Sequence, residues 1–296
     1  MEKLKVDMPI SEDQEILEKM KIAFENCPSA IRHLNDLKVP PEVIDRNLPK
    51  IFDFVSDINY CKKCPGVKNC QKERPLLVTR ITYHNGYLDR ELSPCPEFLK
   101  RLSFEKQFIV RDFPDDWLDY DLRSLDKSEA RKQLIAQYMK YTKDGNNQWM
   151  YLYGGPNSGR TFSAAILTID IARKNLGLIC FLNSSQRIRE LGDLLYSDKG
   201  KFQKELDRYS NIPVLVFDDF GNEFKNDLIR DAIIFPIISA RANKKLLTII
   251  TSDFAIAEIV TLYSTSKAGA LRAKQIGSLI KSTAKEEISF GDLAVY

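Results

Sequence analysis

A glycine-rich loop separates an apolar segment from a long helical pattern in the middle of the chain. Residues 149–153 (WMYLY) are apolar, GGPNSGRT follows at 154–161, and the next residues keep helical periodicity to Lys174. The glycines allow successive backbone N–H groups to converge on an anion, and the helix start adds its positive dipole end. This strand, loop and helix, with G-x-x-x-x-G before a cation and a hydroxyl, indicates a P-loop that binds nucleotide phosphates. A glycine-rich turn that binds nothing is the alternative for the loop taken alone.

The last two loop residues carry most of the expected chemistry. Thr161 is expected to ligate Mg²⁺ through its hydroxyl. Arg160 stands where the pattern has Lys, and its planar guanidinium keeps the charge but demands a different geometry. The residues expected to bind the nucleotide in and beside the loop are Gly154, Gly155, Pro156, Asn157, Ser158, Gly159, Arg160, Thr161 and Phe162.

Two carboxylates follow another apolar segment, at residues 214–217. Ligands of open parallel sheets bind at the carboxyl ends of the strands, so Asp218 and Asp219 are expected beside the loop. Asp218 is expected to hold Mg²⁺ and Asp219 to orient or activate an attacking water. A third apolar segment, 247–250, ends in Thr-Ser-Asp, which could reach a γ-phosphate or the water. A turn or a helix cap would explain either set of polar residues by itself.

Short apolar runs alternate with helical patterns through the second half of the chain, which predicts a P-loop α/β domain with a parallel sheet. The first hundred residues are mostly helical in pattern, with a hairpin expected at Asn85-Gly86. We expect a small domain at 1–97, a linker at 98–125 and the α/β domain at 126–296. The expected strands are 148–153, 178–182, 214–217 and 246–251, and the expected helices are 11–26, 28–37, 126–143, 161–174, 184–196 and 226–242.

Four of the six cysteines fall within a short segment, at Cys61, Cys64, Cys70 and Cys95. Disulfides are unfavourable in the cytosol, where we expect the protein, because no apolar segment is long enough to cross a membrane and the start has no secretory pattern. The C-x-x-C pair with two further thiols predicts a structural Zn²⁺ site with four protein ligands. His84 is the competing fourth ligand in place of Cys70, and buried free cysteines are the remaining alternative.

The nucleotide motifs together resemble the bacterial AAA+ ATPases that load replicative helicases, the DnaI/DnaC group. The segments that carry the resemblance are GGPNSGRTF, VLVFDDFGNE, IIFPIISAR and LLTIITSDF. CKKCPGVKNC and ELSPCPEF resemble the zinc-containing helicase-interaction domain that precedes the ATPase in one branch of this group. IstB-type transposition ATPases are more distant relatives, and the cysteine-rich segment disfavours that alternative.

The resemblance implies an AAA+ domain that uses ATP and Mg²⁺ after a small, mostly helical zinc-binding domain. The implied partners are a DnaB-type replicative helicase hexamer, single-stranded DNA, other primosome proteins and further copies of the chain. Asp253 occupies the sensor position, where relatives usually have Asn, and its charge would face phosphate and weaken nucleotide binding unless it is offset. Gln275 and Leu279 align with two arginines of relatives. We therefore expect weak or absent hydrolysis. A nucleotide-independent adaptor with a degenerate ATP site is the alternative.

The distribution of charged and apolar residues gives predictions that are less specific than those from the motifs. The net charge of +3 is too small to indicate a DNA-binding protein by itself. Basic residues are candidates for DNA phosphate contacts, although a solvated helix face is the alternative for each of them. These are Lys244, Lys245, Lys267, Arg272, Lys274, Lys281 and Lys285. Ile16, Met20, Ile22 and Phe24 would either dock on the helicase or pack in the core of the first domain.

Overall fold

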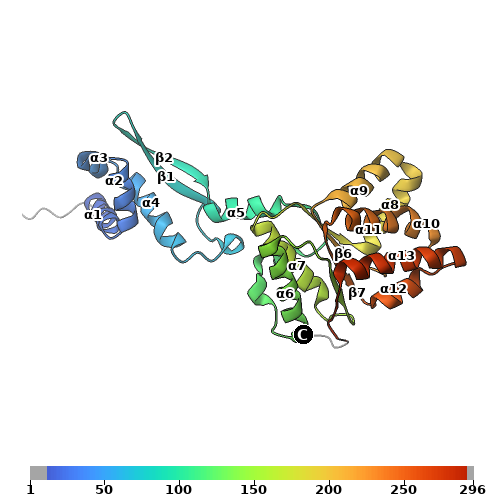
Figure 1. The fold of residues 1–296 in the computed structure, drawn as a ribbon. Coiled ribbons are helices and arrows are strands. Elements are labelled where there is room, and N and C mark those ends of the chain that lie inside the picture. The colour runs from blue at the N-terminus through green and yellow to red at the C-terminus, as the bar shows by residue number, and fades with distance from the viewer. Residues whose placement is uncertain (1–11, 292–296) are drawn as a thin grey trace, which may run out of the picture. The chain divides into compact units, whose positions relative to one another are not determined.

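The computed structural model describes residues 12–291 (Figure 1). The chain divides into two compact units, Met1–Leu102 and Ser103–Tyr296. Ser11, which was expected to open the first helix, lies outside the described residues.

Helices and one β-hairpin make up the first unit. The predicted helix 11–26, the helix 28–37 and the hairpin with its Asn85-Gly86 turn are confirmed within one or two residues. Its small core contains Leu34 and Ile51 from the helices and Ile81 and Leu88 from the hairpin. The elements are α1 (Glu12–Glu25), α2 (Pro28–Asp36), α3 (Pro41–Arg46), α4 (Leu48–Cys61), the 3-10 helix η1 (Val67–Asn69), β1 (Leu77–His84), β2 (Tyr87–Pro94) and α5 (Pro96–Glu105).

A six-stranded sheet forms the centre of the second unit. Its strands are ordered β3-β5-β6-β7-β4-β8, and every neighbouring pair is parallel, as predicted. The order places β4, which leads into the glycine-rich loop, between β7 and β8. The strands are β3 (Phe108–Arg111), β4 (Met150–Tyr153), β5 (Ile179–Asn183), β6 (Val214–Asp218), β7 (Leu247–Ser252) and β8 (Glu287–Ser289).

Helices cover both faces of this sheet (Figure 1). One face packs against α6 and α7, and the other packs against α8, α9, α11, α12 and α13. Alternate residues of the buried strands therefore enter different cores, which is why these strands are continuously apolar. The helices are α6 (Glu129–Asp144), α7 (Arg160–Arg173), α8 (Ser184–Ser197), α9 (Lys199–Asn211), α10 (Asp227–Ile229), α11 (Phe235–Lys244), α12 (Ile256–Tyr263) and α13 (Lys267–Ala284), with η2 (Asp115–Asp119), η3 (Leu122–Ser124) and the π-helix η4 (Arg230–Ile234).

The segment expected to be a linker, 98–125, is instead ordered structure. Part of it continues α5, and β3 pairs with β5 as the edge strand of the large sheet. Phe113 and Leu118 are buried against that sheet. After α5 the segment has no clear period, because it consists of one short edge strand and two 3-10 turns that a few aromatic and aliphatic contacts hold in place.

α6 begins three residues later than the predicted helix 126–143. Ser128 is the N-cap residue, and its side chain makes no capping hydrogen bond. Asp126 accepts a hydrogen bond from the Ser128 backbone N–H at 2.8 Å and pairs with Arg131 Nε at 3.2 Å. Gly145, in the left-handed conformation at φ 63°, ends the helix one residue beyond the predicted range.

Candidate nucleotide-binding site

The glycine-rich loop joins the carboxyl end of β4 to the first turn of α7, as its sequence predicts. Asn157 and Gly159 have φ angles of 60° and 83°, which turn the backbone sharply before the helix. A Cβ atom on Gly159 would lie 2.4 Å from Nη2 of Arg131, so a side chain there would be both strained and obstructed. The turn leaves the N-terminus of α7 facing the loop, which is the arrangement that binds phosphate.

A cavity of about 580 Å³ opens at this loop. Residues 156–162 line it together with Asp219, Asn222, Asp253 and Trp117. Asp218, Gly154 and Gly155, also expected at the site, are not among the residues that line the cavity, and Asp218 is buried. The volume is large enough for a small-molecule ligand.

Asp218 is buried at the end of β6 next to two threonine hydroxyls. Thr251 Oγ1 donates a hydrogen bond to Asp218 Oδ1 at 2.7 Å, and Thr161 also donates to this carboxylate. Burial raises the pKa of Asp218 to about 6, against the lowering effect of the Thr251 hydrogen bond. Thr161 and Asp218 are thus two adjacent oxygen donors of the kind that Mg²⁺ prefers. These two residues fit a magnesium ion bound with nucleotide.

Asp219 adopts a backbone conformation that is uncommon for a residue with a side chain. Its φ is 55°, and its backbone N–H donates to Thr251 Oγ1 at 3.0 Å. Burial raises the pKa of its carboxyl, and the charge of Arg160 acts in the opposite direction. The turn directs Asp219 into the lining of the cavity while Asp218 stays buried.

Arg160 and Asp253, two of the four departures from the pattern of the relatives, form an ion pair. Arg160 Nη2 donates to Asp253 Oδ1 at 2.5 Å, and Nη1 donates to the backbone carbonyls of Gly154 and Ser252. Asn222 Nδ2 donates to the other carboxylate oxygen of Asp253 at 2.7 Å. Burial by itself would raise the pKa of Asp253, but the hydrogen bonds from Arg160 and Asn222 hold it below its ordinary value. The charge that we expected to face phosphate is therefore offset by the cation of the loop itself.

Sequence reasoning missed Asn222, which lines the cavity, and two further residues of the site. Arg131 of α6 is buried under the loop, where Nη2 donates to the Ser158 carbonyl at 2.7 Å and the guanidinium lies 4.4 Å from the ring centre of Phe290. Trp117 borders the cavity and packs edge-on against Phe162, with 5.2 Å between ring centres. Neither residue has a sequence signal, because an arginine in an amphipathic helix and a tryptophan in an aperiodic segment are both ordinary.

The region aligned with the arginines of relatives lies on α13. Gln275 accepts a hydrogen bond from Arg272 Nη1 at 2.9 Å, and Leu279 is half-buried. Arg272 lies 3.9 Å from the ring centre of Phe235 and 3.5 Å from a carboxylate oxygen of Asp231. These contacts hold Arg272 within its own chain.

Glu223, four residues after Asp219, is a buried carboxyl group that the sequence analysis did not single out. Oε2 accepts a hydrogen bond from the Gly221 N–H at 2.9 Å, and Oε1 has no hydrogen-bond partner among residues 12–291. Burial raises its pKa to about 7, outweighing the backbone N–H groups that lower it. The folded chain therefore holds a proton on Glu223 at pH values where the unfolded chain releases it.

We expect Glu223→Gln to raise the free energy of unfolding of the second unit by about 2 kcal/mol at pH 8 and to change it little at pH 4.5. In wild type the protonated Glu223 contributes fully to the free energy of unfolding below the ordinary glutamate pKa. This contribution is lost as the pH rises to about 7, whereas glutamine does not titrate. Urea unfolding followed by tryptophan fluorescence measures this, because Trp117 and Trp149 both lie in the second unit. The exposed Glu286→Gln is the matched control. If the free energy of unfolding changed equally with pH in wild type and in Glu223→Gln, the prediction would be contradicted.

The four clustered cysteines line one small pocket of the first unit. Burial raises the pKa of the Cys61 thiol despite the nearby charge of Lys72, whereas backbone N–H groups of Leu76 and Lys72 lower the pKa of Cys70 and favour its thiolate. Within residues 12–291, no group of three or more His, Cys, Asp and Glu side chains is arranged to hold a metal ion. The donor set fits zinc in chemical type, and the zinc site stays a prediction.

His84 lies away from this pocket. It is the last residue of β1, whereas Leu76 and Leu77 at the other end of the strand line the pocket. The length of an eight-residue strand separates these positions by about 23 Å. This placement favours Cys70 over His84 as the fourth ligand.

A protein-family model matches more than half of the chain. The family model described as IstB-like ATP binding protein matches residues 103–270, which include the loop, Asp218, Asp219 and Asp253. The chain belongs to this family of ATP-binding proteins. The family assignment explains why the cavity beside the loop has the lining of a nucleotide site.

Similarity to individual proteins extends beyond the matched region. The replicative helicase loader DnaI of Bacillus subtilis (strain 168) is 23% identical over 270 residues, which cover 86% of this chain and 85% of that protein. The predicted resemblance of this IstB-like protein to the DnaI/DnaC group is thereby confirmed.

Two solved structures share the fold of this chain over 63% of its residues. A crystal structure of DnaI matches with a TM-score of 0.53 and 22% identity, covering 63% of this chain and 96% of that one. A primosome component from Streptococcus pyogenes serotype M3, described as putative, matches with a TM-score of 0.51 and 18% identity, over 63% of this chain and 94% of that one. The AAA+ assignment of the α/β unit rests on these matches and on the family. In the part of the chain that the structure describes, no helix combines the length and apolar character needed to cross a bilayer.

Proposed function

We propose that the protein is a helicase loader of DNA replication, which binds ATP and a DnaB-type replicative helicase and helps to place the helicase on single-stranded DNA. The observation that carries this proposal is the similarity to the replicative helicase loader DnaI over 86% of the chain. That similarity extends beyond residues 103–270, the part shared with IstB-like proteins in general. It therefore favours a loader over a transposition ATPase.

The geometry of the second unit supports Mg²⁺-dependent binding of ATP. The backbone N–H groups of the loop and the start of α7 would hold the phosphates, and Thr161 and Asp218 would hold the ion. The bound ion would neutralise phosphate charge and fix the phosphate positions. Arg160, at the end of the loop, is the one cation among the described residues that line the cavity.

Hydrolysis in this proposal is weak or absent. Asp219 borders the cavity and would orient the attacking water, while Asp253 at the sensor position is occupied by its ion pair with Arg160. The positions of Gln275 and Leu279 supply no arginine to a neighbouring subunit, and such an arginine accelerates phosphoryl transfer by roughly three to five orders of magnitude. Multiple-turnover hydrolysis that Asp219→Asn abolishes would contradict this part of the proposal.

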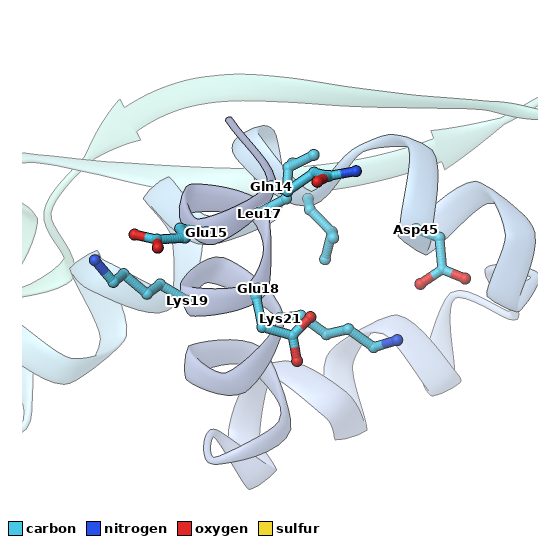
Figure 2. Close-up of a pocket in the computed structure, with 8 residues that line it drawn as sticks. Gln14, Glu15, Leu17, Glu18, Lys19, Lys21 and Asp45 are labelled. Atoms are coloured by element: carbon cyan, nitrogen blue, oxygen red, sulfur yellow. The ribbon is translucent and has the colours of Figure 1, made fainter. Parts of the chain in front are cut away.

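The first unit is proposed to contact the helicase. α1 exposes Ile16, Leu17 and Ile22, whereas Phe24 packs against the core, so the apolar residues of this helix divide between the two expected roles. A groove of about 660 Å³ runs beside α1 (Figure 2). Figure 2 shows Glu15, Glu18 and Lys21 on α1, with Asp45 across the groove. The groove combines two leucines, Leu17 and Leu48, with charged side chains, a mixture that protein interfaces commonly have.

Single-stranded DNA is proposed to contact α13. Lys267, Lys274 and Lys281 follow one another at seven-residue intervals and are exposed, so they share one face of the helix. Such a row can follow the phosphates of a strand. Further copies of the chain and other primosome proteins are the remaining proposed partners.

Leu17→Asp in α1 is expected to weaken helicase binding at least about tenfold, because it places a charge in an apolar contact. The measurement is size-exclusion chromatography and titration of the full chain with the DnaB-type helicase of the same organism. Leu92→Asp, an exposed leucine on the hairpin of the same unit, is the matched control. No complex between the wild-type chain and the helicase would overturn the proposed function.

A nucleotide-independent adaptor would give a different result when the chain is mixed with the same helicase. A loader needs its nucleotide site, so Thr161→Ala should reduce deposition of helicase on single-stranded DNA while the complex still forms. If the protein is an adaptor with a degenerate ATP site, Thr161→Ala should bind helicase as well as wild type does. It should also deposit the same amount of helicase on single-stranded DNA. Deposition measured with and without ATP separates the two functions.

A further inference from the structure

The cation of the phosphate loop already has an anionic partner in this chain. Arg160 is almost fully buried, and its Nη2 lies 2.5 Å from Oδ1 of Asp253, whose side chain is 29% exposed. Asp253 follows the last residue of β7, the strand that pairs with β4 in register, so the pair spans the carboxyl ends of two neighbouring strands. The contact thus follows from the topology of the sheet.

Acidic groups outnumber cations where phosphates would bind. Among the described residues that line the cavity, Arg160 is the only cation, while Asp219 and Asp253 are both acids. A third acid, the buried Asp218, interacts electrostatically with both Asp219 and Arg160. A ligand with several negative charges therefore meets one guanidinium whose charge is already offset by Asp253.

The position of Asp253 relative to the loop indicates which phosphate it affects. The cation at the end of a P-loop reaches the β- and γ-phosphates, whereas the backbone N–H groups of the loop hold the α- and β-phosphates. Here the carboxylate of Asp253 occupies an anion position on that cation, on the side of the neighbouring strand. A second hydrogen bond, from Asn222 Nδ2 at 2.7 Å, holds it there.

We propose that the Asp253 carboxylate takes the place of a third phosphate on Arg160, so that the site binds nucleoside diphosphates more tightly than triphosphates. This inference rests on the proposed nucleotide site and specifies the class of nucleotide that the site prefers. A diphosphate uses the loop N–H groups and the N-terminus of α7 and leaves the ion pair intact. A triphosphate must displace Asp253 from Arg160 or lie beside it as a second anion, and both arrangements cost binding free energy.

Magnesium does not remove this difference between the two nucleotides. An ion held by Thr161 and Asp218 would neutralise part of the phosphate charge, and it would do so for both nucleotides. The Asp253 carboxylate stays next to the guanidinium in either case. The preference for the diphosphate is therefore a property of residue 253, and the asparagine usual at that position in relatives would not produce it.

The test compares ADP and ATP on the full-length chain. Each nucleotide displaces a fluorescent ADP analogue in millimolar Mg²⁺, with wild type, Asp253→Asn and Asp193→Asn. Asp193 is an exposed carboxylate on α8 outside the cavity, so its variant removes the same charge elsewhere. We expect wild type and Asp193→Asn to bind ADP roughly tenfold more tightly than ATP. Asp253→Asn should bring the ratio close to one by strengthening ATP binding, with ADP binding little changed.

A second variant keeps the test decisive if Asp253→Asn alone perturbs the fold. Arg160→Lys with Asp253→Asn restores the lysine and asparagine usual in relatives, and it is expected to bind ATP at least as tightly as ADP. Equal affinities in wild type, or a ratio that both variants leave unchanged, would overturn the inference while the nucleotide site stands. Failure of both nucleotides to bind wild type at millimolar concentration would instead refute the proposed nucleotide site.

Discussion

Alanine at Thr161 or Asp218 is expected to weaken Mg²⁺-dependent nucleotide binding by at least about 100-fold. The two side chains are in contact beneath the loop, and each would contribute an oxygen to the same ion. Loss of either oxygen leaves the phosphate charge less neutralised next to Asp219 and Asp253. Titration with a fluorescent ATP analogue, with and without Mg²⁺, measures the effect.

The dependence on Mg²⁺ separates loss of the ion site from general damage to the loop. In both variants the residual affinity should become nearly independent of Mg²⁺. Arg160→Ala, by contrast, should weaken binding under both conditions, because it removes a cation and leaves Asp253 unpaired. Thr261→Ala on α12 and Asp193→Ala on α8 are exposed matched controls and should behave as wild type. Full Mg²⁺-dependent binding in Thr161→Ala or Asp218→Ala would refute the assigned roles.

The second large effect concerns the cysteine pocket. We expect the purified chain to contain one zinc ion, and Cys61→Ser combined with Cys95→Ser to remove it. Structural zinc contributes on the order of 10 kcal/mol to the folding of small zinc domains, and this part of the first unit has a small core. The segment between Cys61 and Cys95 should then become sensitive to protease. Metal content by mass spectrometry and limited proteolysis measure the two consequences.

Two further variants identify the ligands. His84→Ala should retain the zinc, because His84 lies at the far end of β1 from the pocket, whereas Cys70→Ser should release it. Cys180→Ala in the second unit removes a buried thiol outside the pocket and should leave the metal content unchanged. A wild-type chain without zinc would show instead that the four thiols pack as free cysteines.

Local pattern was sufficient for the main elements of the second unit. Four of its six strands and the glycine-rich loop were predicted from apolar runs and their flanking residues, and α7 was predicted from its periodicity. β3 and β8 were not predicted, because each is an edge strand of three or four residues whose pairing with β5 or β4 stabilises it. α9 was also missed, since its sequence is mostly polar and buries only one side.

The types of residue at the candidate site were also evident before the structure. A cation and a hydroxyl after GxxxxG, and two carboxylates after a buried strand, have few other common uses at these places in an α/β domain. Arg241 shows the limit of such reasoning. It belongs to the segment IIFPIISAR, yet it is fully buried and donates to Thr248 and to the carbonyls of Tyr209, Ile212 and Leu247. Burial lowers its pKa to about 9, and its role is to hold α11 against α9 and β7.

The sequence by itself determined most of the strands and helices and which residues are candidates for phosphate and metal chemistry, because these depend on neighbours within a few positions along the chain. Only the tertiary structure decided that Asp253 pairs with Arg160, that Arg131 supports the loop from α6, and that His84 lies away from the cysteines. Each of these contacts depends on strand order or strand length. Strand order is fixed by long-range packing between elements, which short-range periodicity does not encode.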